Sequence, residues 1–216
     1  GVRKFDTAYV YGEGSVEMLL GNVFGSNNNV DFISKLPANR KPNTNDDNVL
    51  ITDYYDPYIM RIQLGEILDR LKRDFIDTIL LHNWHPSWGI NNTIFDTMLS
   101  FRNEGLCRKI GVSLPNRFEN DLDLSMVDGF DVIEIPYNEI ERKWSTSILK
   151  QHHKKKSFLI RSLFSQGKFF HEDNGDLMNF YSPSNINTYI RSMLCFGSVV
   201  LGMTNKNQIF QNLNSI

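Results

Sequence analysis

Asp6 and Tyr11 lie close together near the start of this 216-residue chain, in the segment FDTAYVYG. Asp6 ends an apolar run, and Tyr11 falls in a turn that leads to a predicted helix. A tyrosine is a weak acid, with a reference pKa of about 10. A buried cation beside it would stabilise the phenolate, lower that pKa and make the side chain a usable proton donor. Because a buried lysine needs a carboxylate beside it, Lys35 together with Asp6 is the candidate for that cation.

Short apolar runs alternate with helical patterns along the chain. Seven runs cover residues 2–8, 31–36, 77–82, 109–114, 131–137, 157–163 and 198–202. Apolar strands that are each followed by a helix predict a parallel sheet covered by helices. Polar residues end or follow the first five runs, at Asp6, Lys35, His82, Ser113 and Asn138. In a (β/α)8 barrel the loops after the strands hold the chemistry, so this placement indicates a common site.

We therefore predict an α/β fold, a (β/α)8 TIM barrel that lacks its first strand and N-terminal hairpin in this chain. Only five residues precede Asp6, which predicts a fragment or a truncated product. We expect one domain over residues 1–216, because no composition shift or linker divides the chain. An open doubly wound sheet is the alternative, but the glycine-rich turn after its first strand is absent.

Three helices can be placed between the runs. Asp56-Pro57 predicts an N-cap and a first turn, after which apolar positions recur at helical spacing as far as Phe75. A helix over residues 94–101 is closed by Gly105. A helix over residues 14–24, with Gly25 as its C-cap, has four apolar residues predicted on one side: Leu19, Leu20, Val23 and Phe24.

Several segments are similar to motifs of one family, in the same order. FDTAxxYGxGxxExxLG at residues 5–21, ISKL at 33–36, DTILLH at 77–82 and KIGVS at 109–113 resemble those of the aldo-keto reductase family. IPYN at 135–138, RSxFxQG at 161–167 and VxG at 200–202 continue the match. The resemblance covers essentially the whole chain and implies an NAD(P)H-dependent oxidoreductase acting on CH–OH groups.

The family's chemistry is the reduction of an aldehyde or ketone to an alcohol, with a hydride from NADPH or NADH. By resemblance Tyr11 is the general acid, with Lys35 as the cation that lowers its pKa and Asp6 as the group that neutralises and aims the lysine. His82 donates a hydrogen bond to the carbonyl oxygen and orients the substrate. The implied substrate is a small carbonyl compound, with a sugar derivative as the guess.

The resemblance also assigns residues to the dinucleotide, beginning with Ser113 and Asn116 at the nicotinamide carboxamide. Glu134 stands where the family usually has glutamine, and a carboxylate can accept but not donate a hydrogen bond. Arg161 stands where many members stack an aromatic ring on the nicotinamide. The remaining assignments are Ser162, Phe164 and Gln166 along the pyrophosphate, and Gly202, Thr204, Lys206, Gln208 and Asn212 at the adenosine end. Lys206 substitutes for an arginine that would bind a 2′-phosphate, so the choice between NADPH and NADH stays open.

Each catalytic candidate also has a structural interpretation when it is taken alone. Asp6 would be a strand-end cap, Lys35 a solvated strand end, and Tyr11 and His82 ordinary half-buried residues. The four together favour catalysis. The alternative is a catalytically weak or inactive cofactor-binding or interaction protein, which Glu134 and the missing strand favour. A hydrolase using Asp6 and Glu17 as paired carboxylates is weaker still, because Glu17 is predicted on a helix.

Composition argues against several classes of partner. With 41% hydrophobic and 22% charged residues and a net charge of −2, the chain has the make-up of a soluble globular protein without a basic surface for nucleic acid. No apolar run approaches the roughly 20 residues that span a bilayer, and a cytoplasmic location is expected. His82 and His85 lack a third ligand, so no metal is predicted. Cys107 and Cys195 are predicted to be buried, reduced thiols. The oligomeric state stays open.

Overall fold

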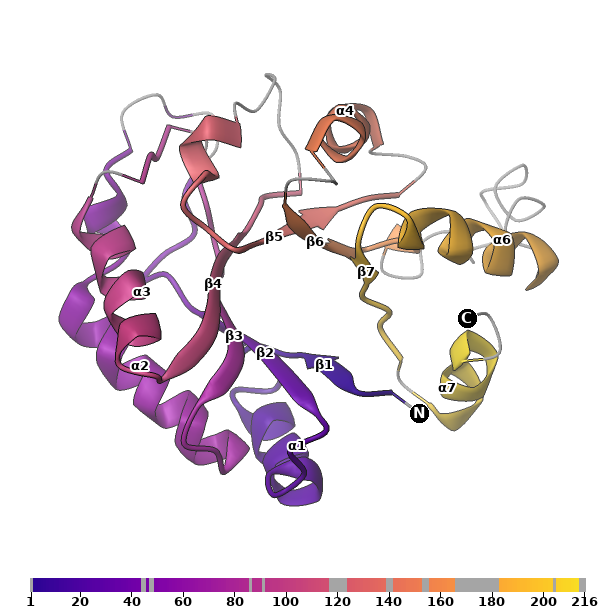
Figure 1. Ribbon diagram of the computed structural model, residues 1–216, viewed down its shortest axis with the longest axis horizontal. Coiled ribbons are helices and arrows are strands. Elements are labelled where there is room, and N and C mark those ends of the chain that lie inside the picture. Colours follow the sequence, from indigo (N-terminus) through magenta and orange to yellow (C-terminus); the bar gives the residue numbers. More distant parts are fainter. Residues whose placement is uncertain are drawn as a thin grey trace. The chain divides into compact units, whose positions relative to one another are not determined.

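The computed structural model describes residues 2–43, 46, 49–85, 87–90, 92–116, 124–138, 142–152, 156–165, 183–203 and 205–213 (Figure 1). Its strands are β1 (Lys4–Asp6), β2 (Asp31–Leu36), β3 (Ile76–Leu81), β4 (Cys107–Ser113), β5 (Val132–Pro136), β6 (Ser157–Arg161) and β7 (Ser198–Val199). They follow one another in the sheet in chain order. The helices are α1 (Ser15–Phe24), η1 (Ile51–Asp53), α2 (Pro57–Leu71), α3 (Thr93–Asn103), η2 (Leu124–Val127), α4 (Arg142–His152), α6 (Pro183–Leu194) and α7 (Lys206–Leu213).

The chain divides into two compact units. The N-terminal unit consists of residues 2–115 and 122–133, and the C-terminal unit of residue 1, residues 116–121 and residues 134–216. The expectation of one domain over residues 1–216 stays a prediction.

A parallel sheet forms the centre of the N-terminal unit. The pairing of β1 with β2 places Asp6 opposite Ile33, and the pairing of β2 with β3 places Lys35 opposite Leu80. Helices α1, α2 and α3 lie along one side of β1 to β4 (Figure 1). Strands β2, β3 and β4 are buried along most of their length, as a parallel sheet covered by helices requires. All seven predicted strands are present, with shorter bounds for the first, the fifth, the sixth and the last.

Helix α2 begins where the sequence predicts and ends earlier. The Asp56 side chain accepts hydrogen bonds from the Tyr58 and Ile59 main-chain N–H groups at 2.9 and 3.0 Å, which satisfies donors at the helix start. The helix ends at Leu71, and its C-cap, Lys72, adopts a left-handed conformation with φ 54°. Phe75 therefore lies after the helix, and its prediction as part of the helical face was wrong. The apolar positions that recur at helical spacing, as predicted, are buried: Met60, Leu64, Ile67, Leu68 and Leu71.

Helix α1 buries only part of the apolar side that the sequence predicts. Leu19 and Val23 are 61% and 59% exposed, whereas the buried residues are Glu17 and Gly21. A Cβ atom at Gly21 would lie 2.2 Å from the Arg70 carbonyl oxygen. The helix therefore meets α2 through a glycine, because only a residue without a side chain allows so close an approach. Of the four apolar residues predicted on one side, Leu20 and Phe24 are half-buried, whereas Leu19 and Val23 face outward.

The C-terminal unit contains β6, β7 and the end of β5. β6 and β7 pair in parallel, with Leu159 opposite Ser198 and Ile160 opposite Val199. The main-chain N–H of Tyr137 donates to the Arg161 carbonyl at 2.9 Å, which ties the end of β5 to the end of β6. Helices α4 and α6 bury apolar side chains: Ile148, Leu149, Tyr189, Ile190 and Met193.

The two cysteines differ in environment. Cys107, the first residue of β4, is buried, whereas Cys195, which follows α6, is exposed. The prediction of two buried thiols was therefore wrong for Cys195. The apolar run that follows α6 is short, and Leu194, the last residue of α6, is also exposed.

Among the described residues, no helix combines the length and apolar character needed to cross a membrane.

Candidate active site

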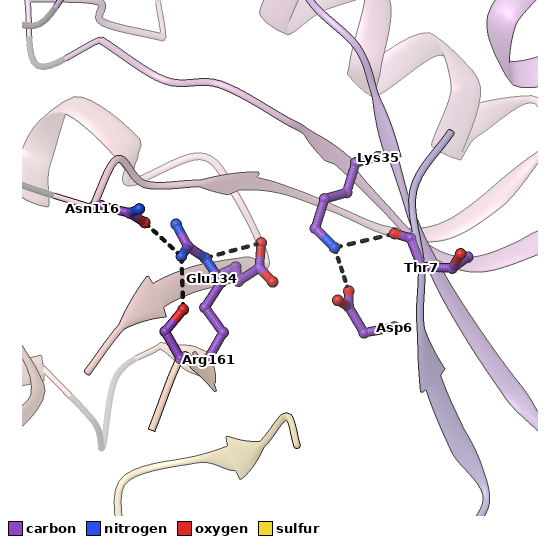
Figure 2. A network of polar contacts seen from close by, with 7 residues as sticks. Asp6, Thr7, Lys35, Asn116, Glu134 and Arg161 are labelled. Carbon is purple, nitrogen blue, oxygen red and sulfur yellow. Dashed lines mark hydrogen bonds and ion pairs between the residues drawn. The ribbon is translucent and has the colours of Figure 1, made fainter. Parts of the chain in front are cut away.

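Lys35 and Asp6 form a buried ion pair at the ends of neighbouring strands. The Lys35 Nζ atom lies 2.6 Å from Asp6 Oδ1 and 3.1 Å from the Thr7 carbonyl oxygen (Figure 2). The lysine is only 1% exposed. A main-chain bond of 2.8 Å from Thr7 N to the Ile33 oxygen continues the β1–β2 pairing past Asp6 and holds the carboxylate in place. Each charge is thus compensated where water is largely excluded.

Tyr11 lies over this ion pair in a tight turn. The Lys35 Nζ atom is 5.6 Å from the centroid of the Tyr11 ring. The turn is held by main-chain bonds from Tyr11 N to the Ala8 oxygen at 3.0 Å and from Gly14 N to the Tyr9 oxygen at 2.8 Å. Gly12 and Gly14 adopt positive φ angles of 66° and 84°, which glycine tolerates at little cost. Tyr11 itself is 42% exposed, so the residue is accessible from solvent while its ring lies beside a buried cation.

His82 follows the third strand of the same edge. It comes directly after β3, and its main-chain N–H donates to the Leu36 carbonyl at 3.0 Å. Leu36 is the neighbour of Lys35, so His82 leaves the sheet beside the strand that bears the lysine. Asp6, Lys35 and His82 thus occupy the carboxyl ends of three neighbouring parallel strands, where barrel enzymes place their reactive groups.

Glu17 has a role that the sequence did not reveal. Its side chain is 0% exposed, its Oε2 atom lies 2.7 Å from Arg70 Nε, and its Oε1 atom accepts a hydrogen bond from the Ser34 hydroxyl. The Arg70 guanidinium lies 5.1 Å from the centroid of the Tyr9 ring. These contacts connect the turn that holds Tyr11, strand β2 beside Lys35, and helix α2.

The same contacts argue against a hydrolase with Asp6 and Glu17 as its carboxylates. Each carboxylate is bound to a different cation, Asp6 to Lys35 and Glu17 to Arg70. Glu17 is also held by Ser34 in the interior. The sequence contained one signal for the structural role of Glu17, namely its position in the first turn of α1, on the same side as Gly21.

The loop after β3 packs into the protein. Trp84 and Trp88 are buried edge to face at 5.6 Å, and Trp84 packs edge to face on Phe130 at 5.5 Å. The His85 Nδ1 atom lies 2.7 Å from the Ser87 hydroxyl. The two indoles and His85 are therefore core residues. No group of three or more His, Cys, Asp or Glu side chains within the described ranges is placed to bind a metal ion.

Arg161 connects three residues that the sequence assigned to the cofactor, all in the C-terminal unit. Its Nη1 atom donates to Asn116 Oδ1 at 2.7 Å and to the Ser162 hydroxyl at 3.2 Å (Figure 2). Its Nε atom lies 3.8 Å from Glu134 Oε2, and the glutamate is buried. The two departures from the family pattern, Glu134 and Arg161, are therefore an ion pair.

The other described cofactor candidates lie on other elements of the two units. Ser113 is buried at the end of β4 in the N-terminal unit. Phe164 is half-buried, three residues after β6. Gln166 and Thr204 lie outside the described residues. The described adenosine-end candidates lie on α7 or in the segment before it: Gly202, Lys206, Gln208 and Asn212.

Comparison with known proteins identifies the family. The aldo/keto reductase family model matches residues 1–185, and the chain belongs to the aldo/keto reductase family. Membership of this family makes the chain an oxidoreductase. No curated protein sequence matches it.

Solved structures share the fold. An aldo-keto reductase from Bacillus halodurans in its holo form has a TM-score of 0.71 at 17% identity, over 100% of this chain and 77% of that one. The glycerol dehydrogenase from Gluconobacter oxydans has a TM-score of 0.70 at 19% identity, over 98% and 75%. An aldo/keto reductase from Klebsiella pneumoniae in complex with NADP and acetate has 0.67 at 20% identity, over 100% and 75%. The predicted barrel fold class is confirmed.

Proposed function

We propose that this chain reduces the carbonyl group of an aldehyde or ketone to an alcohol, with NADPH or NADH as the hydride donor. The observation that carries the proposal is the buried Lys35–Asp6 pair beneath the accessible ring of Tyr11. A phenol held over a buried ammonium group can release a proton at a pH where a free phenol would retain it.

The four side chains then have distinct tasks. Tyr11 donates its hydroxyl proton to the carbonyl oxygen as negative charge develops there, and Lys35 stabilises the phenolate that results. Asp6 holds the ammonium group in position and balances its charge. His82 donates a hydrogen bond to the same oxygen and orients the substrate. The substrate that we propose is a small carbonyl compound, such as a sugar derivative.

The chain also offers groups that suit a dinucleotide. Arg161 and Lys206 are cations that can bind phosphate oxygens, and Ser113, Asn116 and Ser162 can hydrogen-bond an amide or a phosphate. The structure from Klebsiella pneumoniae contains NADP, which supports the same cofactor here. When bound, the dinucleotide would supply the hydride.

A second candidate is a protein that binds the cofactor without turnover. The Glu134–Arg161 ion pair favours it, since a carboxylate replaces a group that would both donate and accept hydrogen bonds to a carboxamide. The Asp6–Lys35–Tyr11 arrangement opposes it.

The test separates binding from chemistry. NADPH affinity is measured by fluorescence titration, and turnover by loss of NADPH absorbance with a panel of aldehydes, ketones and sugar derivatives. Tyr11→Phe should lower kcat by about 100-fold or more, the scale of a general acid, and leave the NADPH Kd unchanged. Tyr9→Phe, in the same turn, is the matched control. NADPH binding with no turnover over the whole panel would select the second candidate.

A further inference from the structure

Tyr55 makes two hydrogen bonds to the main chain of the residue that follows His82. Its hydroxyl donates to the Asn83 carbonyl oxygen at 2.8 Å and accepts from the Asn83 N–H at 2.9 Å. Tyr55 is buried and lies 28 positions before Asn83 in the sequence. One phenol therefore satisfies both polar main-chain groups of one loop residue.

We propose that Tyr55 is a positioning residue for His82, whose imidazole it directs by fixing the main chain on the loop side. The proposal rests on the proposed function, in which His82 donates a hydrogen bond to the substrate carbonyl. Tyr55 acts through Asn83 and needs no contact with substrate or cofactor.

The need for such a residue follows from where β3 ends. His82 still uses its N–H in the sheet, through the 3.0 Å bond to the Leu36 oxygen. At Asn83 the chain leaves the sheet, in surroundings that are partly buried. Polar main-chain groups in such a place must find partners, and Tyr55 supplies both. The backbone of His82 is thus fixed from the sheet on one side and from Tyr55 on the other.

Tyr55 is itself held by rigid neighbours. Its N–H donates to the Ile51 oxygen at 3.0 Å in η1, and it directly precedes Asp56, the N-cap of α2. Its ring lies 6.0 Å from Trp88 in an edge-to-face arrangement, and Trp88 Nε1 donates to the Val49 oxygen at 2.8 Å. A functional side chain is placed most accurately when the residue supporting it is locked by packing in this way.

The hydroxyl also keeps its proton. Burial raises the pKa of the Tyr55 phenol well above its ordinary value, and the hydrogen bond from the Asn83 main chain offsets this only in part. The group therefore remains both donor and acceptor over the whole range in which such an enzyme works. A histidine or carboxylate in its place would change its hydrogen bonding with pH.

Tyr55→Phe is the direct test, with Tyr54→Phe as the matched control. Phenylalanine retains the packed ring and removes both hydrogen bonds to Asn83. Tyr54 is the adjacent buried tyrosine and packs on the same Trp88 at 5.5 Å, but its hydroxyl is not the one bonded to Asn83. We expect Tyr55→Phe to lower kcat by about 10- to 100-fold, the cost of a small misplacement of a reacting group, with an unchanged NADPH Kd. Tyr54→Phe should have the activity of the parent protein.

A spectroscopic measurement separates positioning from a loss of stability. In protein labelled with 15N-histidine, the His82 imidazole signals should move or broaden in folded Tyr55→Phe and stay in place in Tyr54→Phe. Unchanged kcat and unchanged His82 signals in folded Tyr55→Phe would overturn the proposal. If the parent protein binds NADPH but reduces nothing, the proposed function fails, and the imidazole signals still decide the role of Tyr55.

A second measurement covers a variant that does not fold. In the parent protein the Asn83 amide should exchange with deuterium as slowly as the His82 amide, which is bonded within the sheet. Fast exchange at Asn83 would show that the Tyr55 bonds do not hold the loop, and would overturn the proposal.

Discussion

The Nζ atom of Lys35 lies 2.6 Å from Oδ1 of Asp6, and both side chains are almost completely removed from solvent. Burying one charge alone is costly, and the attraction between the two offsets that cost only while both are present. The pair therefore has a structural role as well as the proposed catalytic one. A variant that removes one partner should affect both.

Asp6→Asn should destabilise the protein strongly. The substitution leaves the Lys35 ammonium buried without its counter-charge, a change that costs about 3–5 kcal/mol in other buried pairs. The free energy of unfolding, measured in urea, should fall accordingly. The control is Glu104→Gln, which breaks the ion pair of Glu104 with Arg61; those side chains are 44% and 48% exposed, and exposed pairs contribute little. Similar losses in the two variants would contradict this account.

Two glutamates that share one arginine offer a sharper comparison. Arg70 lies 2.7 Å from the buried Glu17 and 3.6 Å from Glu66, which is 58% exposed. Glu17→Gln should cost about 3–5 kcal/mol of stability, because it removes the buried partner of Arg70 and leaves only the more distant, exposed Glu66 as a counter-charge. Glu66→Gln should be nearly neutral.

Kinetics add a second readout for Glu17. Because it links the Tyr11 turn to the strand of Lys35, folded Glu17→Gln should also lose kcat, whereas Glu66→Gln should retain it. Loss of stability with full kcat in the folded fraction would limit Glu17 to a purely structural role.

Glycines in the two facing helices should respond in opposite directions to alanine. At Gly21 a Cβ atom would lie 2.2 Å from the Arg70 carbonyl oxygen, so α1 must move away from α2 and the Tm should fall. At Gly65, inside α2, a Cβ atom would meet nothing within 4 Å. Gly65→Ala should stabilise the protein by about 1 kcal/mol through helix propensity. A stable Gly21→Ala variant would show that the helices have room to separate.

Glu134→Gln should tighten the binding of NADPH. A carboxamide can both donate and accept, so the variant gains about one hydrogen bond to the nicotinamide amide, or roughly 2- to 10-fold in Kd. The loss of the ion pair should be tolerated, since Arg161 keeps its bonds to Asn116 and Ser162. Fluorescence titration measures the change. A weaker Kd would indicate that the Glu134–Arg161 pair itself holds the cofactor.

The sequence predicted features that depend on local pattern. Strand positions follow from continuous apolar runs, and Asp6, Lys35 and His82 follow from where those runs end. It could not predict that Glu17 would bind Arg70, 53 positions away, because that bond depends on how α1 packs on α2. The same packing put Gly21 inward and Leu19 outward, which apolar periodicity alone predicts the other way round. The sequence did not predict the role of Tyr55, because its partners are main-chain groups, and the type of residue at position 83 does not reveal them.

The two thiols should differ in reactivity. Burial raises the pKa of Cys107 to about 12, mainly by desolvation of its thiolate, whereas Cys195 is exposed. A thiol reagent should therefore modify Cys195 in the native protein and reach Cys107 only after unfolding; Cys195→Ser should leave the native protein unreactive.

The raised pKa of Cys107 also sets a pH dependence of stability. The folded-state pKa is about 12 and the ordinary value is 9.0, so the unfolded chain loses this proton first as the pH rises. The stability that the neutral thiol contributes is complete below about pH 9 and is lost between about pH 9 and pH 12. Cys107→Ala should remove this part of the alkaline destabilisation, measured as the free energy of unfolding against pH. An unchanged alkaline slope in Cys107→Ala would show that other groups, such as the buried Tyr55 phenol, dominate above pH 9.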